Sequence, residues 1–175
     1  MIFAVVGPSG AGKDTLIAGA LERRPDLRLA RRVITRPTEA GGEDFEGVTP
    51  EAFAARKARG AFALDWEAHG LRYGIPHDQL QGGDVIFNGS RAALPAAQAA
   101  FPDLRVILVT ASAPVLAARL AARGRESEAD IRERLGRASF DLPPGTRATV
   151  VANDGAVEDG VARLLAALQP DRAAR

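Results

Sequence analysis

A glycine-rich segment near the N-terminus has the residue types and spacing of a phosphate-binding loop. It fits the pattern G-x-x-x-x-G-K and consists of Gly7, Pro8, Ser9, Gly10, Ala11, Gly12 and Lys13. Glycines allow backbone N–H groups to turn inward around a phosphate chain, and the start of a following helix adds partial positive charge. The spacing predicts that Lys13 contacts the terminal phosphates of a nucleotide. A glycine turn that only joins a strand to a helix leaves Lys13 unexplained.

The residue after the lysine departs from this pattern. A serine or threonine is expected there, because its hydroxyl binds Mg²⁺, but the chain has Asp14 followed by Thr15. Mg²⁺ prefers carboxylate and water oxygens, so Asp14 is a candidate ligand, directly or through water. Alternatively, Asp14 only complements the positive end of the helix dipole. Both interpretations remain open, and residues 7–15 form the predicted nucleotide-binding segment.

Two arginines in the second half of the chain are candidates for the group-transfer step. Arg119 and Arg123 are four residues apart in an expected helix, so they share one face. The guanidinium group stays charged and its planar fork matches phosphate oxygens, which suits a group that neutralises a transferred phosphoryl. Arg125 and Arg134 are weaker candidates. The alternative is that these arginines lie on a solvated helix face.

Composition excludes several other chemistries. The 175 residues include 23 basic and 22 acidic side chains, a net charge of +1, so no bulk charge favours nucleic acid or an anionic membrane. There is no cysteine, which excludes a thiol nucleophile and cysteine-ligated metals. Only two histidines, His69 and His77, argue against a histidine-based triad. No apolar run reaches the ~18 residues that span a bilayer, and the first residues lack a signal-peptide pattern. We therefore expect a cytoplasmic protein.

The elements that must position these residues alternate between strand and helix. An apolar run at 2–6 predicts a buried strand, and a helical pattern follows at 14–24. The second half predicts strands at 85–87, 104–109 and 148–151 and helices at 91–100, 114–122, 127–139 and 156–168. The middle of the chain has a basic stretch at 28–36 and predicts a loop at 38–48, a helix at 50–59 capped by Thr49, and a hairpin or two short strands at 61–75. This alternation predicts an α/β fold, a parallel sheet with helices on both faces. We expect one domain over 1–168 and a flexible tail at 169–175.

Several strings resemble guanylate kinases over nearly the whole chain. The run Leu116–Leu120, then residues 123–127, Ile131, Arg134, Leu135 and Ala138, resembles the lid and the helix after it. Asn153-Asp154 resembles the late Asn-Asp near the adenine. The acceptor-binding region is resembled by further strings: Thr35-Arg36-Pro37, residues 42–45, the 60–66 segment and Tyr73-Gly74. The resemblance implies the P-loop nucleoside-monophosphate-kinase fold, three-layered, with a parallel central sheet. It places the acceptor-binding region at about 30–80 and the lid at about 119–134, and it implies that Asn153 and Asp154 bind ATP.

Departures from guanylate kinases fall in the region that holds GMP. The segment after Arg36 is shortened and lacks a second arginine. Phe45 replaces an expected tyrosine, Ile75 an expected serine, and Asn88 and Ser90 the two aspartates of an Asp-x-Asp strand end. A base edge left without its hydrogen bonds is strongly rejected, so these changes should impair purine recognition.

Several strings of the chain resemble one subgroup, the ribose 1,5-bisphosphate phosphokinases of phosphonate catabolism. These strings lie at 7–14, 31–37, 42–48, 69–76 and 85–91. The resemblance implies transfer of the γ-phosphate of ATP to ribose 1,5-bisphosphate, which gives 5-phosphoribosyl 1-diphosphate (PRPP) and ADP. ATP and Mg²⁺ are then the expected cofactor set, and small molecules the expected partners, with no nucleic acid or membrane. A homo-oligomer stays open. The alternatives are a guanylate or other nucleoside-monophosphate kinase, or a non-catalytic binding module, against which Lys13, Arg119 and Arg123 argue.

Such an acceptor carries two phosphates and no base. Candidate ligands for its phosphates are Arg36, Arg72, Tyr73 and Arg91, with Arg31 and Arg32 as weaker options. Candidates for the ribose hydroxyls are Asp44, Asp65 and Asn88. Asn88 follows a predicted strand at the end where ligands bind in open α/β sheets. A phosphate acceptor is already ionised near pH 7, so the reaction needs no general base.

Overall fold

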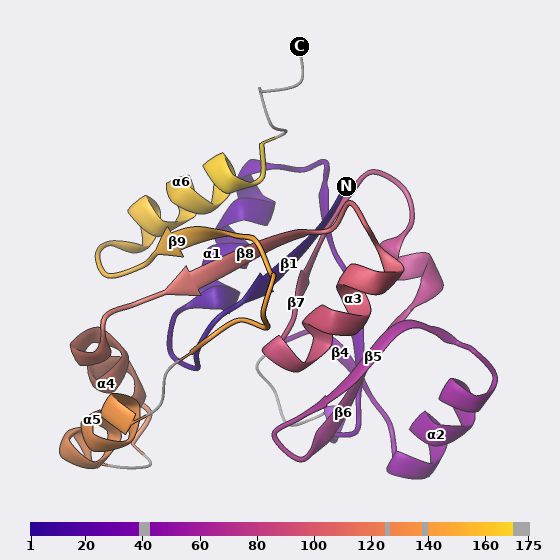
Figure 1. The fold of residues 1–175 in the computed structure, drawn as a ribbon, viewed down its shortest axis with the longest axis horizontal. Coiled ribbons are helices and arrows are strands. Elements are labelled where there is room, and N and C mark those ends of the chain that lie inside the picture. The colour runs from indigo at the N-terminus through magenta and orange to yellow at the C-terminus, as the bar shows by residue number, and fades with distance from the viewer. Residues whose placement is uncertain (39–42, 125–126, 138–139, 170–175) are drawn as a thin grey trace. The chain divides into compact units, whose positions relative to one another are not determined.

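The computed structural model describes residues 1–38, 43–124, 127–137 and 140–169 (Figure 1). Nothing is stated about residues between these ranges or after them. The chain divides into two compact units, and the first strand contributes residues to both. The first unit contains Met1–Ala4 and Pro25–Arg105, and the second contains Val5–Arg24 and the chain from Val106 onward. The predicted domain limits, acceptor region and lid stay predictions.

A five-stranded sheet has the strand order β2-β7-β1-β8-β9. Its strands are β1 (Ile2–Val6), β2 (Leu27–Leu29), β7 (Asp84–Asn88), β8 (Arg105–Thr110) and β9 (Ala148–Ala152). In the first unit β2 runs parallel to β7, and in the second unit β8 runs parallel to β9. The expected α/β fold with a parallel sheet is confirmed.

Continuous apolar runs form the centre of this sheet. Residues 3–6 of β1 and 85–87 of β7 are all fully buried. A strand buried on both faces has no solvent side, which explains why its sequence shows an unbroken apolar run rather than alternation. The predictions at 2–6, 85–87, 104–109 and 148–151 are confirmed to within a residue or two.

The first unit also holds a four-stranded sheet of order β4-β3-β6-β5. Its strands are β3 (Arg32–Ile34), β4 (Phe45–Gly47), β5 (Phe62–Ala68) and β6 (Leu71–Pro76). β5 and β6 form the predicted hairpin, which turns at His69 and Gly70, both with positive φ. The loop predicted at 38–48 is wrong at β4, and β2 and β3 lie in a stretch to which no strand was assigned. Three residues are too few to show a periodicity, so the sequence carries no signal for them.

The helix α2 (Pro50–Ala58) begins where predicted, because the hydroxyl of Thr49 accepts a hydrogen bond from the Ala52 amide at 3.1 Å. Its buried Phe53 stacks on Phe62 of β5, with ring centroids 4.7 Å apart. The predicted helix at 91–100 begins as a short 3₁₀ turn and continues as α3. The remaining elements of this unit are η2 (His77–Leu80), η3 (Arg91–Ala93) and α3 (Leu94–Ala100).

The helices of the second unit are α1 (Lys13–Arg23), α4 (Ala113–Ala121), α5 (Glu128–Arg137) and α6 (Val157–Ala167). Figure 1 shows α6 beside β9, and α6 also packs on α1. That contact is close, because a Cβ on Gly19 of α1 would lie 2.6 Å from Cγ2 of Val161. The hydroxyl of Ser127 accepts a hydrogen bond from the Asp130 amide at 3.2 Å, as expected for the cap of α5. Within the described residues, no helix is long and apolar enough to cross a membrane.

Candidate functional site

The glycine-rich segment joins β1 to α1 and has the backbone of a tight, inward-turning loop. Gly10 and Gly12 have φ values of 87° and 89°, a left-handed conformation that favours glycine. The Ala11 amide donates to the Pro8 carbonyl at 3.1 Å, which closes the turn. A Cβ on Gly7 would lie 2.2 Å from the Val109 carbonyl oxygen, so the loop also needs glycine where it leaves the sheet.

Lys13 is the first residue of α1 and folds back over this loop. Its ammonium donates to the carbonyl of Gly7 at 2.8 Å and to that of Pro8 at 3.3 Å. The lysine therefore lies along the loop that the sequence predicts to hold phosphates. Asp14 and Thr15 are exposed in the first turn of α1.

Arg119 in α4 and Arg123, just after the C-terminal end of α4, both reach the phosphate loop. Arg119 donates to the carbonyls of Gly10 at 3.3 Å and Ala11 at 3.2 Å. Arg123 approaches the hydroxyl of Ser9 at 3.5 Å. The shared face expected from their spacing is present, and it is directed at the loop. Of the weaker candidates, Arg125 lies outside the described residues, as does the side chain of Arg134.

Asn153 follows β9 and is hydrogen-bonded to the phosphate loop. Its side-chain amide donates to the Ala11 carbonyl at 2.7 Å, and its own carbonyl accepts from Arg119 at 2.6 Å. Asn153 is buried. Its neighbour Asp154 accepts a hydrogen bond from the Ser112 amide at 2.5 Å, just before α4. The resemblance implied contact with the nucleotide for this pair, and the sequence did not suggest these hydrogen bonds.

Asp14 is the carboxylate beside the loop that the sequence predicts as a Mg²⁺ ligand. Among the described residues, no group of three or more histidine, aspartate, glutamate or cysteine side chains converges on a metal-sized site. Asp14 stands next to Lys13 at the start of α1. This donor set fits Mg²⁺ held mainly by substrate phosphates and waters with one carboxylate, which is the usual mode for that ion.

In the first unit, the guanidinium of Arg36 lies over the ring of Phe45, 4.3 Å from its centroid. Phe45 is buried in β4, so it provides a fixed apolar surface under the charged group. The phenylalanine that replaces an expected tyrosine therefore supports the best phosphate candidate of this unit.

Arg32 is committed to the structure of the first unit. It is 8% exposed, forms a two-point ion pair with Glu43 and donates to the Asn88 carbonyl at 2.8 Å. Its guanidinium also lies 5.1 Å from the ring centroid of Tyr73. Tyr73 stacks in turn on Trp66, with centroids 5.4 Å apart and an interplanar angle of 4°. This chain of contacts orders the strand ends around Asn88.

The remaining acceptor candidates are exposed. Asp44 pairs with Arg31 at 3.1 Å, and its side chain is 82% exposed. Arg91 is exposed at the start of η3. Arg72 pairs with Glu67 at 3.1 Å, directly across the β5–β6 hairpin.

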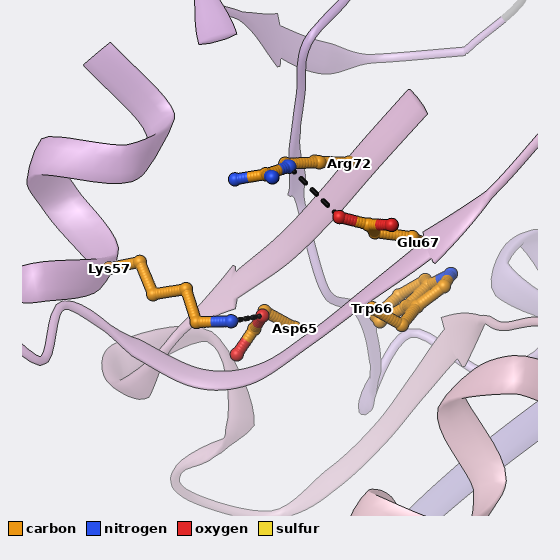
Figure 2. A pocket seen from close by; sticks show the side chains of 5 residues that line it. All are labelled: Lys57, Asp65, Trp66, Glu67 and Arg72. Carbon is orange, nitrogen blue, oxygen red and sulfur yellow. Dashed lines mark ion pairs between the residues drawn. The ribbon is translucent and has the colours of Figure 1, made fainter. Parts of the chain in front are cut away.

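Arg72 and Glu67 belong to a pocket of about 300 Å³ on the hairpin (Figure 2). Lys57 reaches this pocket from α2 and pairs with Asp65 at 2.8 Å. Trp66 also lines the pocket. Sequence reasoning missed Lys57 and Glu67 as pocket residues. The available signal was that Lys57 is one of only two lysines among 23 basic residues.

A second ion pair joins α2 to β4 in the same unit. Arg56 donates to both carboxylate oxygens of Glu46, at 2.6 and 2.9 Å. These hydrogen bonds lower the pKa of Glu46 and raise the pKa of Arg56. The pair holds α2 against β4 and in this way positions the backbone of Lys57.

The predicted site residues separate cleanly between the two units. All candidates for the nucleotide lie in the second unit: residues 7–15, Arg119, Arg123, Asn153 and Asp154. All candidates for the acceptor lie in the first: Arg36, Asp44, Arg72, Tyr73, Asn88 and Arg91. Each unit thus carries one half of the expected chemistry.

Comparisons with known proteins find relatives that match nearly the whole chain. The chain is 51% identical to ribose 1,5-bisphosphate phosphokinase PhnN of Ruegeria sp. (strain TM1040), and the match covers 98% of this chain and 93% of that protein. It is 49% identical to the protein of that name from Rhizobium etli (strain CIAT 652), over 96% and 89%. Among solved structures, guanylate kinase from Anaplasma phagocytophilum aligns with a TM-score of 0.66 at 18% identity, covering 96% of this chain and 84% of that one. No protein-family model matches the chain.

Proposed function

This chain belongs to the ribose 1,5-bisphosphate phosphokinase family, and from that premise we propose that it transfers the γ-phosphoryl group of ATP to ribose 1,5-bisphosphate. An oxygen of the acceptor's 1-phosphate forms a bond to the γ-phosphorus, and the bond from that phosphorus to the β–γ bridging oxygen breaks. The products are 5-phosphoribosyl 1-diphosphate and ADP. The acceptor oxygen is already ionised near pH 7, so no proton has to be removed from it.

The phosphate loop is the observation that carries this proposal. Its left-handed glycines, Gly10 and Gly12, give it the turn that cradles a nucleotide's phosphates. Lys13 and Arg119 lie on the loop carbonyls, within reach of a phosphate chain held there. When ATP binds, we expect both cations to exchange these carbonyls for phosphate oxygens, because charge-assisted hydrogen bonds to phosphate are stronger.

Arg119 and Arg123 serve the transferred group. Phosphoryl transfer depends mainly on positioning and on neutralising charge on the equatorial oxygens. A guanidinium matches two of those oxygens at once. Mg²⁺ bound to the substrate phosphates supplies further charge neutralisation, and Asp14 is the residue of this chain that would hold it.

The first unit binds the acceptor. Arg36, supported by Phe45, is the principal phosphate ligand, and Asn88 at the end of β7 binds a ribose hydroxyl. Trp66 and Tyr73 stack on each other rather than presenting open aromatic faces, which favours an acceptor without a base.

An ADP-release assay with Mg-ATP tests the proposal, comparing ribose 1,5-bisphosphate, GMP and no acceptor at matched concentrations. We expect turnover on the sugar bisphosphate, with GMP at least a hundredfold worse and Lys13→Ala inactive on both. A preference for GMP would refute the proposed acceptor, because it would mean that Phe45, Ile75, Asn88 and Ser90 are compatible with purine binding.

A further inference from the structure

The pocket on the β5–β6 hairpin is lined almost entirely by charged groups. Asp65 and Glu67 are two residues apart on β5, so they project from the same face of the strand. Arg72 stands opposite Glu67 on β6, and Lys57 approaches from α2. Figure 2 shows Lys57 directed at Asp65 and Arg72 directed at Glu67.

Each cation in this pocket is held by one carboxylate at partly exposed positions. The side chains of Lys57 and Arg72 are 58% and 45% exposed. Ion pairs of this kind contribute little stability, because water screens them. A phosphate offers more charge and more acceptor oxygens than a carboxylate, so it can replace Asp65 and Glu67 as the partner of the two cations. The carboxylates released in this way are acceptors for hydroxyl groups.

The size and lining of the pocket fit a phosphorylated sugar. A volume of about 300 Å³ lies at the lower end of the range for small-ligand sites. Trp66 is 6% exposed and stacked on Tyr73, so it offers no open ring face for a base. The lining therefore presents charges for a phosphate and for hydroxyls, and no platform for a purine.

We propose that this pocket binds the ribose and the non-reacting 5-phosphate of the acceptor, with Lys57 and Arg72 as phosphate ligands and Asp65 as a hydroxyl ligand. The proposal rests on the function proposed above and names Lys57 as a further specificity-determining residue. The acceptor carries two phosphates, and Arg36 is already the proposed ligand of one of them. Lys57 and Arg72 are separate from that contact, so we assign the pocket to the phosphate that does not react.

A binding measurement without turnover tests this assignment. Isothermal titration calorimetry measures occupancy without a spectroscopic reporter. Ribose 5-phosphate and ribose 1-phosphate are titrated separately into the ATP-free protein. We expect saturable binding of ribose 5-phosphate and at least tenfold weaker binding of ribose 1-phosphate.

Lys57→Gln is the test variant, and Lys57→Arg retains the charge. Arg59→Gln removes an equal charge two residues away, at an exposed position that does not line the pocket. We expect Lys57→Gln to weaken ribose 5-phosphate binding about tenfold and to raise the KM for ribose 1,5-bisphosphate similarly, with the KM for ATP unchanged. Lys57→Arg should stay within threefold of the wild type, and Arg59→Gln should not differ from it.

The proposal is overturned if the wild type does not bind ribose 5-phosphate, or if Lys57→Gln binds it as tightly as Arg59→Gln does. Either result can occur while the wild type still converts ribose 1,5-bisphosphate, in which case only the pocket assignment fails. Loss of that conversion in the wild type is a separate result and removes the proposed function itself, together with the acceptor assignment that depends on it.

Discussion

The side-chain amide of Asn153 donates a hydrogen bond to the backbone carbonyl of Ala11 at 2.7 Å, although the two residues are 142 positions apart in the sequence. This bond ties the end of β9 to the phosphate loop. Arg119 is bound to the carbonyls of both residues, so the loop, β9 and α4 share one set of contacts. Buried amides with such partners are costly to remove, because the loop carbonyl would lose one of its donors.

Gly160 makes room for Asn153. A Cβ at Gly160 would lie 2.4 Å from the side-chain oxygen of Asn153. In an unobstructed helix, glycine to alanine stabilises by about 1 kcal/mol. We expect Gly160→Ala to destabilise instead, by about 1–3 kcal/mol, and to raise the KM for ATP by displacing Asn153 from the loop. Chemical denaturation and steady-state kinetics measure both effects.

Gly155→Ala is the matched control for that substitution. Gly155 lies in the same unit, its φ is not in the left-handed region, and a Cβ there would meet nothing within 4 Å. It should change neither stability nor the KM for ATP appreciably. A stabilised Gly160→Ala protein with normal kinetics would show that the position of Asn153 does not depend on Gly160.

We propose that Arg119 acts on the phosphates rather than on folding alone. Arg119→Met should lower kcat on the order of 10²–10³-fold, the usual cost of losing a charge-stabilising group in the transition state. Arg147→Met removes an exposed arginine of the same unit and should leave kcat within twofold. Equal kcat values for the two variants, measured by ADP release, would remove Arg119 from the catalytic group.

Phe45 supports Arg36 through its ring. Phe45→Leu keeps an apolar side chain but removes the cation–π contact, which is worth about 0.5–2 kcal/mol. We expect the KM for ribose 1,5-bisphosphate to rise roughly 3- to 30-fold, with the KM for ATP unchanged. Phe53→Leu, in a buried aromatic pair that contacts Phe62, should lower the melting temperature without this selective change. A selective change in both variants would contradict the specific role of Phe45.

The Glu46–Arg56 pair makes stability depend on pH in one direction. The pKa of Glu46 in the folded protein lies below its unfolded value of about 4.3. The pair therefore stabilises the protein above that pH. The contribution is lost as pH falls through the folded pKa of Glu46. Because both side chains are partly exposed, we expect less than about 1 kcal/mol at pH 7. Denaturation of the wild type and Glu46→Gln should differ at pH 7 and converge once the pH falls below the folded pKa of Glu46, and a constant difference would refute the assignment.

The sequence predicted the elements that carry a periodic or apolar signal. The strands β1, β7 and β8 are buried runs, and the caps at Thr49 and Ser127 lie where the pattern placed them. The three-residue strands β2, β3 and β4 were missed, since their stability comes from pairing with distant segments. Local sequence contains no information about such partners.

The same distinction holds for the candidate site. The loop residues and the pair Arg119–Arg123 could be predicted, because their spacing is set within one loop or one helix. The Asn153–Ala11 hydrogen bond and the Lys57–Asp65 pair depend on tertiary contacts between separate elements. Residue type and spacing gave no indication of either contact.

The most direct test of the proposed reaction follows the transferred phosphorus itself. ATP labelled in its γ-phosphate is incubated with ribose 1,5-bisphosphate and the wild-type protein, and the products are separated. We expect the label to appear in the terminal phosphate of the 1-diphosphate group, with one ADP formed per labelled product, and we expect Lys13→Ala to form none. Label released only as inorganic phosphate, or transferred to GMP in preference to the sugar bisphosphate, would contradict it.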